Sequence, residues 1–326
     1  MQIKKYLLIP FVFAAAAGLS AQTESLLNDT FTSGATGTFA TTNNPGIGTQ
    51  SPPTSAEWFG IGSSTAPGAA ETYTNGVGIT NAPKASQSNS SGVIAYFEAP
   101  GSQVTLGVGQ TLTESMTFQY ASAPASSAFG LHMLLLNSGS TGSGAGQNNQ
   151  TLAELGTTTV NGTVAATNYS GYYIQLNPDP SASAASGIFY RPTGSTTSWV
   201  GSNNGSTELG GTPGPQTASL TTDPYKLVLS VTETTPTLMT LTASLEDMTT
   251  DTFLSAYNLT ETTSSIVDSF DTFAIGLGSA NPQVTISDAS VNVSIPEPST
   301  YAAILGVATL GFVAIRGMRK RRQIAA

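Results

Sequence analysis

The chain has 326 residues, of which 9% are charged, and it contains no cysteine. The lack of cysteine excludes disulfides, thiolate metal sites and thiol catalysis. Residues 22–295 hold eighteen acidic and three basic residues, which gives this segment a net charge of −15. An acidic body of this kind repels phosphate backbones, which argues against nucleic acid as a partner.

The N-terminus reads as a secretory signal peptide. Lys4 and Lys5 form a charged start, an apolar stretch runs from Tyr6 to Ala17, and Leu19-Ser20-Ala21 is a small-residue site before Gln22. The apolar part is too short for a membrane span. We therefore expect signal peptidase to remove residues 1–21 and the chain to be exported.

The body, residues 22–295, shows the alternation of apolar and polar residues that is typical of β-strands. Residues 112–120 put Leu112, Met116, Phe118 and Tyr120 on one face, with Thr and Ser opposite. The same pattern, or a shorter apolar run, predicts strands over 225–233, 238–246, 273–277, 93–97, 129–136, 172–176 and 188–190.

The last strand changes parity. Val284 and Ile286 share one face, whereas Val291, Val293 and Ile295 fall on the other. A β-bulge or a switch between sheets near Ser287-Asp288 would reconcile the two sets.

These strands and the turn residues between them predict an all-β, antiparallel β-sandwich. Five residues are expected between its two sheets: Leu227, Leu229, Leu241, Phe118 and Phe273. The turn-rich stretches 33–56, 62–92, 137–168 and 201–222 are predicted to be loops or ragged edges.

Several strand and turn motifs resemble concanavalin-like jelly-roll modules of secreted proteins. They include Asn28-Asp29-Thr30-Phe31, Glu57-Trp58-Phe59, Phe270-Asp271-Thr272-Phe273 and the run from Val284 to Val291. The resemblance implies a jelly roll over most of 26–295 and carries no catalytic signature.

The titratable residues give little sign of catalysis. A glycosidase needs two carboxyl groups about 5–10 Å apart across a groove, and the nearest run is Glu246-Asp247 with Asp251, where adjacent residues point to opposite faces. We interpret these as solvated acids at a strand end. His132 is the only histidine, so a hydrogen-bonded structural role is favoured over a ligand contact on the open sheet face.

A structural calcium ion is compatible with the loops Asn177-Pro178-Asp179 and Asn28-Asp29. Neither loop has the spacing of a calcium motif, so Asn/Asp turn chemistry is favoured and no cofactor is predicted.

Aromatic residues are the best indication of binding, since an aromatic face is a platform for a sugar ring. Trp199 lies in a Ser/Thr/Gly/Asn-rich loop and is the first candidate glycan contact. Trp58 is the second, although Phe59 beside it suggests that the pair is anchored in the core.

The C-terminus, residues 296–326, combines Pro296-Glu297-Pro298, an uncharged run from Tyr301 to Ile315, and a basic end with Arg319, Lys320, Arg321 and Arg322. Fifteen residues make a short transmembrane helix of about 22 Å. Five of the ten basic residues follow it, which places that end in the cytoplasm and the body outside.

This tail resembles the PEP-CTERM sorting domain over residues 296–322. The resemblance implies processing by an exosortase, a membrane transpeptidase-like enzyme, and an association with exopolysaccharide-producing Gram-negative bacteria. An ordinary tail anchor is the alternative.

Three functional hypotheses follow. The first is a non-enzymatic envelope or matrix protein that binds a glycan, with a neutral polysaccharide favoured by the acidic body. The second is a polysaccharide-active hydrolase or lyase whose carboxylates converge from different strands, and the third is a structural or adhesive protein without a ligand. We expect the body in the periplasm first and at the cell surface or in the matrix after processing.

Overall fold

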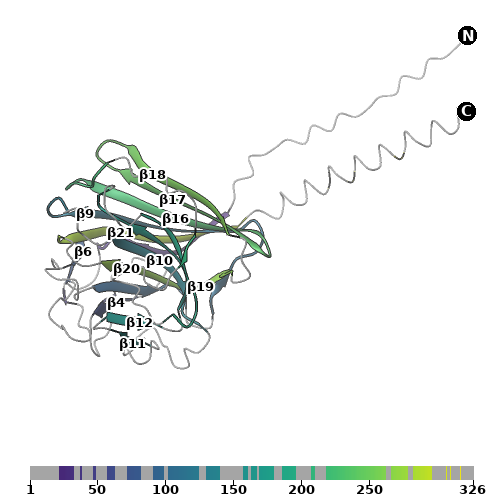
Figure 1. Cartoon of the computed structure of the whole chain (residues 1–326), viewed down its shortest axis with the longest axis horizontal. Helices are drawn as coiled ribbons and strands as arrows, with labels where there is room; N and C mark the ends of the chain where they lie inside the picture. Colours follow the sequence, from purple (N-terminus) through teal and green to yellow (C-terminus); the bar gives the residue numbers. More distant parts are fainter. Residues whose placement is uncertain are drawn as a thin grey trace, which may run out of the picture. The chain divides into compact units, whose positions relative to one another are not determined.

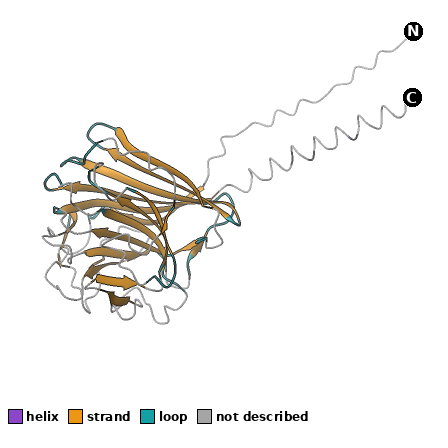
Figure 2. Ribbon diagram, viewed as in Figure 1, coloured by secondary structure: helices purple, strands orange, loops and turns teal. Residues whose placement is uncertain are grey.

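The computed structural model describes residues 22–32, 37–38, 47–48, 57–62, 72–81, 91–98, 102–124, 130–139, 157–160, 163–166, 169–179, 186–195, 207–209, 218–261, 266–277 and 282–295, with 306, 309 and 316. Thr23–Ser294 form a compact unit. Its described residues are strands and turns, as the all-β prediction requires (Figure 2).

Sheet A has nine strands, and neighbours along the order β18-β17-β16-β9-β21-β6-β5-β2 are antiparallel, with β1 also paired to β21 (Figure 1). Its strands are β1 (Gln22–Asp29), β2 (Gly37–Thr38), β5 (Thr72–Thr74), β6 (Gly78–Asn81), β9 (Thr111–Tyr120), β16 (Pro224–Thr235), β17 (Leu238–Asp247), β18 (Thr252–Glu261) and β21 (Val284–Ile295).

Sheet B has eight strands in the antiparallel order β15-β14-β13-β10-β20-β7-β4-β3. Its strands are β3 (Ile47–Gly48), β4 (Glu57–Gly62), β7 (Ser91–Tyr96), β10 (Leu131–Asn137), β13 (Ser170–Leu176), β14 (Gly187–Arg191), β15 (Thr207–Glu208) and β20 (Thr272–Leu277). Two short pairs are separate from both sheets: β8 (Val104–Thr105) with β19 (Ser269–Phe270), and β11 (Thr157–Val160) with β12 (Thr163–Ala166).

The core between the sheets contains the residues expected there. Leu227, Leu229, Leu241, Phe118 and Phe273 are all 0% exposed. The two sheets therefore form an antiparallel β-sandwich of the jelly-roll type, and the predicted fold class is confirmed.

Sheet B is buried on its second face as well. Tyr173 and Phe189 stack there with ring centroids 5.1 Å apart, and Leu134, Leu136 and Ile94 belong to the same buried cluster. This explains why β10 and β13 read as apolar runs without alternation.

The predicted bulge in β21 is present. The register between β21 and β9 shifts between Ile286 and Asp288, so that Val284, Ile286, Val291 and Val293 are all buried. Gly78 lies against this point with φ +124°, and a Cβ on it would approach the Ile286 carbonyl oxygen to 1.9 Å. Only glycine fits there.

Several turn-rich stretches contain more structure than predicted. The stretch 62–92 holds the hairpin β5–β6, 137–168 holds β11–β12, and the stretches 33–56 and 201–222 hold β2, β3 and β15. The strands that lie wholly within these stretches are two to four residues long. Such short strands leave too few residues for an alternation to be visible.

The predicted signal peptide, residues 1–21, lies outside the described residues, as does nearly all of the predicted sorting region 296–326. Gly306, Thr309 and Arg316 are described there, each helical and exposed. No helix within the described part of the chain has the length and apolar character that a membrane crossing needs.

Candidate functional site

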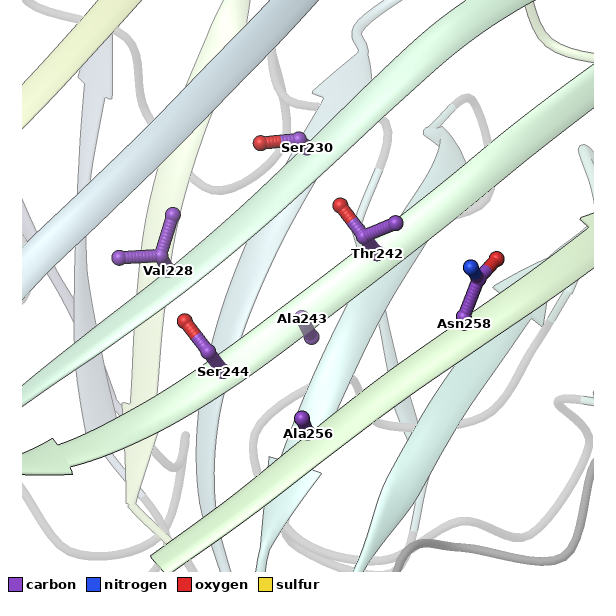
Figure 3. Close-up of a pocket in the computed structure, with 7 residues that line it drawn as sticks. All are labelled: Val228, Ser230, Thr242, Ala243, Ser244, Ala256 and Asn258. Atoms are coloured by element: carbon purple, nitrogen blue, oxygen red, sulfur yellow. The ribbon is translucent and has the colours of Figure 1, made fainter. Parts of the chain in front are cut away.

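A shallow hollow lies on the outer face of sheet A, over β16, β17 and β18. Alternate residues of β16 and β17 are buried in the core, which turns the intervening residues to solvent. The hollow has a volume of about 430 Å³. Figure 3 shows its lining: Val228, Ser230, Thr242, Ala243, Ser244, Ala256 and Asn258.

The lining is uncharged and made of short side chains, and four of its seven residues are polar: Ser230, Thr242, Ser244 and Asn258. The strand registers place Ser230 opposite Thr242 and Thr242 opposite Asn258, so these three residues form a row across the strands. Val228, Ser244 and Ala256 form the next row. We call the outer surface of these two rows the hydroxyl face.

Hydroxyl pairs continue the hydroxyl face towards the centre of sheet A. The Ser230 and Thr113 hydroxyls lie 2.9 Å apart, and those of Ser115 and Ser290 lie 2.8 Å apart. In each pair one hydroxyl donates to the other, so one hydroxyl hydrogen and several lone pairs remain for other partners. Such groups match the hydroxyls of a sugar.

Phe253 is an exposed aromatic ring beside the hydroxyl face. Phe253 is 65% exposed and lies opposite Glu246. Glu246 is two residues along β17 from Ser244. The β17–β18 register shifts between Leu245 and Glu246, but the inner face of sheet A is buried in the core, so an exposed ring lies on the outer face, where the hollow is. Phe253 therefore lies on the same face of sheet A as the hollow. It is about 7 Å along the strand from the row formed by Val228, Ser244 and Ala256.

Charged residues form the third row, between Phe253 and the sheet centre. Glu246 lies opposite Lys226, and Lys226 lies opposite Thr117, which in turn faces Asp288. Burial raises the pKa of Asp288, an effect that the Lys226 ammonium partly offsets. Charges therefore lie beside the hollow and not in it.

The structure contradicts the prediction that Trp58 is a second glycan contact. Its indole is 0% exposed and donates from Nε1 to Asp29 Oδ2 at 2.8 Å. Phe31 and Phe273 contact the ring, with centroids 5.7 Å away in each case. A ring enclosed in this way cannot stack on a sugar, so Trp58 is a core residue.

The other predicted site residues lie outside the described residues. These are the first candidate glycan contact, Trp199, and the sorting residues Pro296, Glu297, Pro298, Arg319, Lys320, Arg321 and Arg322.

His132 has the structural role that was predicted. It is buried, its Nε2 lies 3.1 Å from Gln175 Oε1, and its ring contacts that of Tyr173. It lies on sheet B, away from the hydroxyl face.

Glu98, which follows β7, lies near two other carboxylates: Glu24 of β1 and Asp271, which stands between β19 and β20. Burial raises the pKa of Glu98, and the neighbouring carboxylates of Glu24 and Asp271 raise it further. Asp271 is 0% exposed, however, and its carboxylate accepts hydrogen bonds from Ser138 N, Ser138 Oγ, Thr272 Oγ1 and Gln103 Nε2. It holds the fold together and cannot reach a substrate.

The predicted strand-end acids lie where they were expected: Glu246 and Asp247 are the last two residues of β17, and both are partly exposed. Asp247 Oδ1 accepts the backbone N–H groups of Thr249 and Thr250, at 2.8 and 3.3 Å. Asp251 is exposed in the same turn.

Residues of the two loops considered for calcium take part in hydrogen bonds within the protein. Both Asp29 oxygens already accept hydrogen bonds, Oδ1 from Phe31 N and Oδ2 from Trp58 Nε1, each at 2.8 Å. At the other loop, Asn177 donates its backbone N–H to Ser186 Oγ. Within the described ranges, no three His, Cys, Asp or Glu side chains are grouped as metal ligands would be.

Comparison with known proteins gives structural neighbours alone. No family model matches the chain, and no curated protein matches it either. The neighbours include peanut lectin (12% identity, 80% of this chain and 98% of that one, TM-score 0.36) and arcelin-5, a lectin-like defence protein from Phaseolus vulgaris (10%, 84% and 100%, 0.37). A third is lectin II from Ulex europaeus (13%, 80% and 99%, 0.37). These neighbours are legume-type lectins, and at this level of similarity they define no family for the chain.

Proposed function

We propose that this chain is an exported, non-enzymatic envelope or matrix protein that binds a neutral polysaccharide on the hydroxyl face of sheet A. The observation that carries the proposal is the position of Phe253, an exposed ring on the same side of the sheet as a hollow lined by Ser230, Thr242, Ser244 and Asn258. Ring stacking with short hydrogen-bonding side chains is the combination that sugar recognition needs.

The chemistry of the lining supports binding without catalysis. The described residues that line the hollow include no Asp, Glu, His or Lys that could transfer a proton. The convergent carboxylates Glu98 and Asp271 are excluded as a hydrolytic pair because the oxygens of Asp271 are already occupied.

The charge of the protein supports a neutral ligand. The body carries a net charge of −15, so an anionic polymer would be repelled at ordinary ionic strength. Glu246, which lies between Phe253 and Lys226 in the sheet register, adds a negative charge next to the site.

The proposed location rests on the two ends of the sequence. We infer that signal peptidase removes residues 1–21, that the C-terminal helix 301–315 holds the chain in the inner membrane, and that an exosortase processes the tail at Pro296-Glu297-Pro298. The body then belongs to the cell surface or the exopolysaccharide matrix. A structural or adhesive role without a ligand is the alternative if no glycan binds.

The test is retention on affinity gels that contain neutral polysaccharides. Phe253→Ala should abolish the retention of the wild type, whereas Phe253→Tyr should keep it, since tyrosine also offers a ring face. The control is Val108→Ala, which trims another exposed apolar side chain, 49% exposed, in a turn bonded to the far end of β16. Equal retention of wild type and Phe253→Ala would remove the site, and no retention of the wild type on any neutral glycan would remove the function.

A further inference from the structure

The interior of the sandwich contains a carboxyl group without a hydrogen-bond partner. Glu114 lies in the middle of β9, a central strand of sheet A, and is 0% exposed. Both of its carboxyl oxygens are buried, and neither has a hydrogen-bond partner among the residues that the structure describes. A buried polar group in this condition costs roughly 1–3 kcal/mol, so its presence calls for an explanation.

The surroundings of Glu114 are apolar. Its neighbours across the strands are Leu229 of β16 and Val291 of β21, and Leu112 and Met116 flank it on the same face of β9. All four are 0% exposed. An ionised carboxylate in such an environment would lack both water and a counter-charge.

The titratable groups that share this interior are few. On the inner side of sheet A they are Tyr73, Tyr120, Tyr225 and, towards the end of β16, Glu233. On the inner side of sheet B they are Tyr172 and Tyr190. Two other buried acids have their oxygens hydrogen-bonded: Asp29 to Phe31 and Trp58, and Asp271 to Ser138 and Thr272. No described base faces Glu114 from either sheet.

We propose that Glu114 is a proton-linked switch of stability: the sandwich folds with this carboxyl group protonated, and rising pH weakens the fold. Burial raises the pKa of Glu114 well above its ordinary value in the folded chain. In the unfolded chain the group is exposed and ionises with a pKa of about 4.3.

The sign of the effect follows from these two states. Below about pH 4 the carboxyl group is protonated in both, so it adds no pH dependence. Above that pH the unfolded chain releases the proton while the folded chain keeps it. Stability therefore falls as pH rises, until the folded pKa is reached. One proton of difference multiplies the unfolding constant by about ten for each pH unit.

The inference is independent of the proposed glycan site, because its test needs no ligand. Urea unfolding of the full chain is followed by tryptophan fluorescence from pH 4.5 to pH 8, for wild type and Glu114→Gln. Glutamine has nearly the same volume and cannot ionise. The wild type should lose stability relative to Glu114→Gln by about tenfold in the unfolding constant per pH unit over the lower part of this range.

Two further measurements keep the test decisive if the glutamine variant folds poorly. Glu114→Leu should unfold at a higher urea concentration than the wild type at pH 7 and show the same flattened pH profile. Within the pH range where the wild type loses stability relative to Glu114→Gln, unfolding the wild type in a weakly buffered solution should release more protons than unfolding Glu114→Leu, by up to about one proton. Parallel pH profiles for all three proteins, or equal proton release, would overturn the proposal.

Discussion

The Trp58 indole of β4 and the Asp29 carboxylate of β1 are joined by a 2.8 Å hydrogen bond, and both residues are 0% exposed. The bond connects the end of a sheet A strand to a sheet B strand. Because the same carboxylate also accepts from Phe31 N, one acidic side chain fixes both the turn after β1 and the ring that fills the core beside it.

This bond predicts two different losses of stability. Trp58→Ala should lower the free energy of unfolding by about 3–5 kcal/mol, because it empties a large core volume. Trp58→Phe keeps most of that volume and removes the donor, so it should cost about 1.5–3 kcal/mol. Urea denaturation measures both, and a Trp58→Ala protein as stable as wild type would show that the ring does not fill the core.

The hydroxyl face predicts a loss of binding without a loss of stability. Thr242→Val keeps the shape of the side chain and removes its hydroxyl, so retention on a neutral polysaccharide should weaken. The free energy of unfolding should change by less than about 0.5 kcal/mol. Thr237→Val is the matched control, since Thr237 is an exposed threonine in the turn between β16 and β17. An equal effect of the two substitutions would contradict the assigned face.

The carboxylate of Asp271 predicts a large stability effect. Asp271→Ala removes the acceptor of Ser138 N, Ser138 Oγ and Thr272 Oγ1 and leaves buried donors without partners. Each such donor costs about 1–3 kcal/mol, so thermal unfolding should occur many degrees lower. Asp247→Ala, at a half-buried residue, removes two turn hydrogen bonds and should have a much smaller effect. Similar melting temperatures for the two variants would refute this role.

Gly76 and Gly78 predict losses of stability of different size, because alanine would have an unfavourable φ at both positions but would collide with other atoms only at Gly78. Gly76→Ala should cost about 1–2 kcal/mol, because its φ of +78° is unfavourable for alanine and its Cβ would meet no atom within 4 Å. Gly78→Ala adds a collision with the Ile286 carbonyl at the bulge and should cost about 3 kcal/mol or more. Chemical denaturation compares them, and equal losses would mean that the bulge moves freely.

The ends of the sequence predict a specific processed form. Mass spectrometry of envelope material from the natural host should find the chain starting at Gln22 and ending close to Pro296-Glu297-Pro298. Recovery of a peptide that extends to Ala326 would identify an ordinary tail anchor. Expression in a host without an exosortase provides the control, because the uncut chain should stay in the membrane fraction there.

Regular alternation made the large strands predictable. The faces over 225–233 and 238–246 identified both the core residues and the outward Ser230, Thr242 and Ser244, and the change of parity after Ile286 located the bulge. Burial of one face of a sheet makes apolar and polar residues alternate within each strand, so the pattern can be seen in the sequence of a single strand.

The candidate site was not predictable because it depends on which strands lie side by side. Phe253 stands at the start of β18, where the register shifts between Leu245 and Glu246, so no alternation marks it as outward-facing. The sequence drew attention to tryptophans instead, and Trp58 proved to be buried. Glu114 occupies a position on the face predicted to be apolar, but only the three-dimensional packing shows that neither of its oxygens finds a partner.

The position of β21 has a consequence for how the protein is made. The last strand before the tail is not at an edge of sheet A but beside β9, and the hydroxyls of Ser115 and Ser290 pair across 175 positions of sequence. The sheet therefore cannot close until the ribosome has synthesised nearly the whole body, since contacts so distant in sequence form late. In the export that we propose, the body would therefore complete its fold only after its last strand has crossed the membrane, and the segment beginning at Pro296 follows directly after that strand.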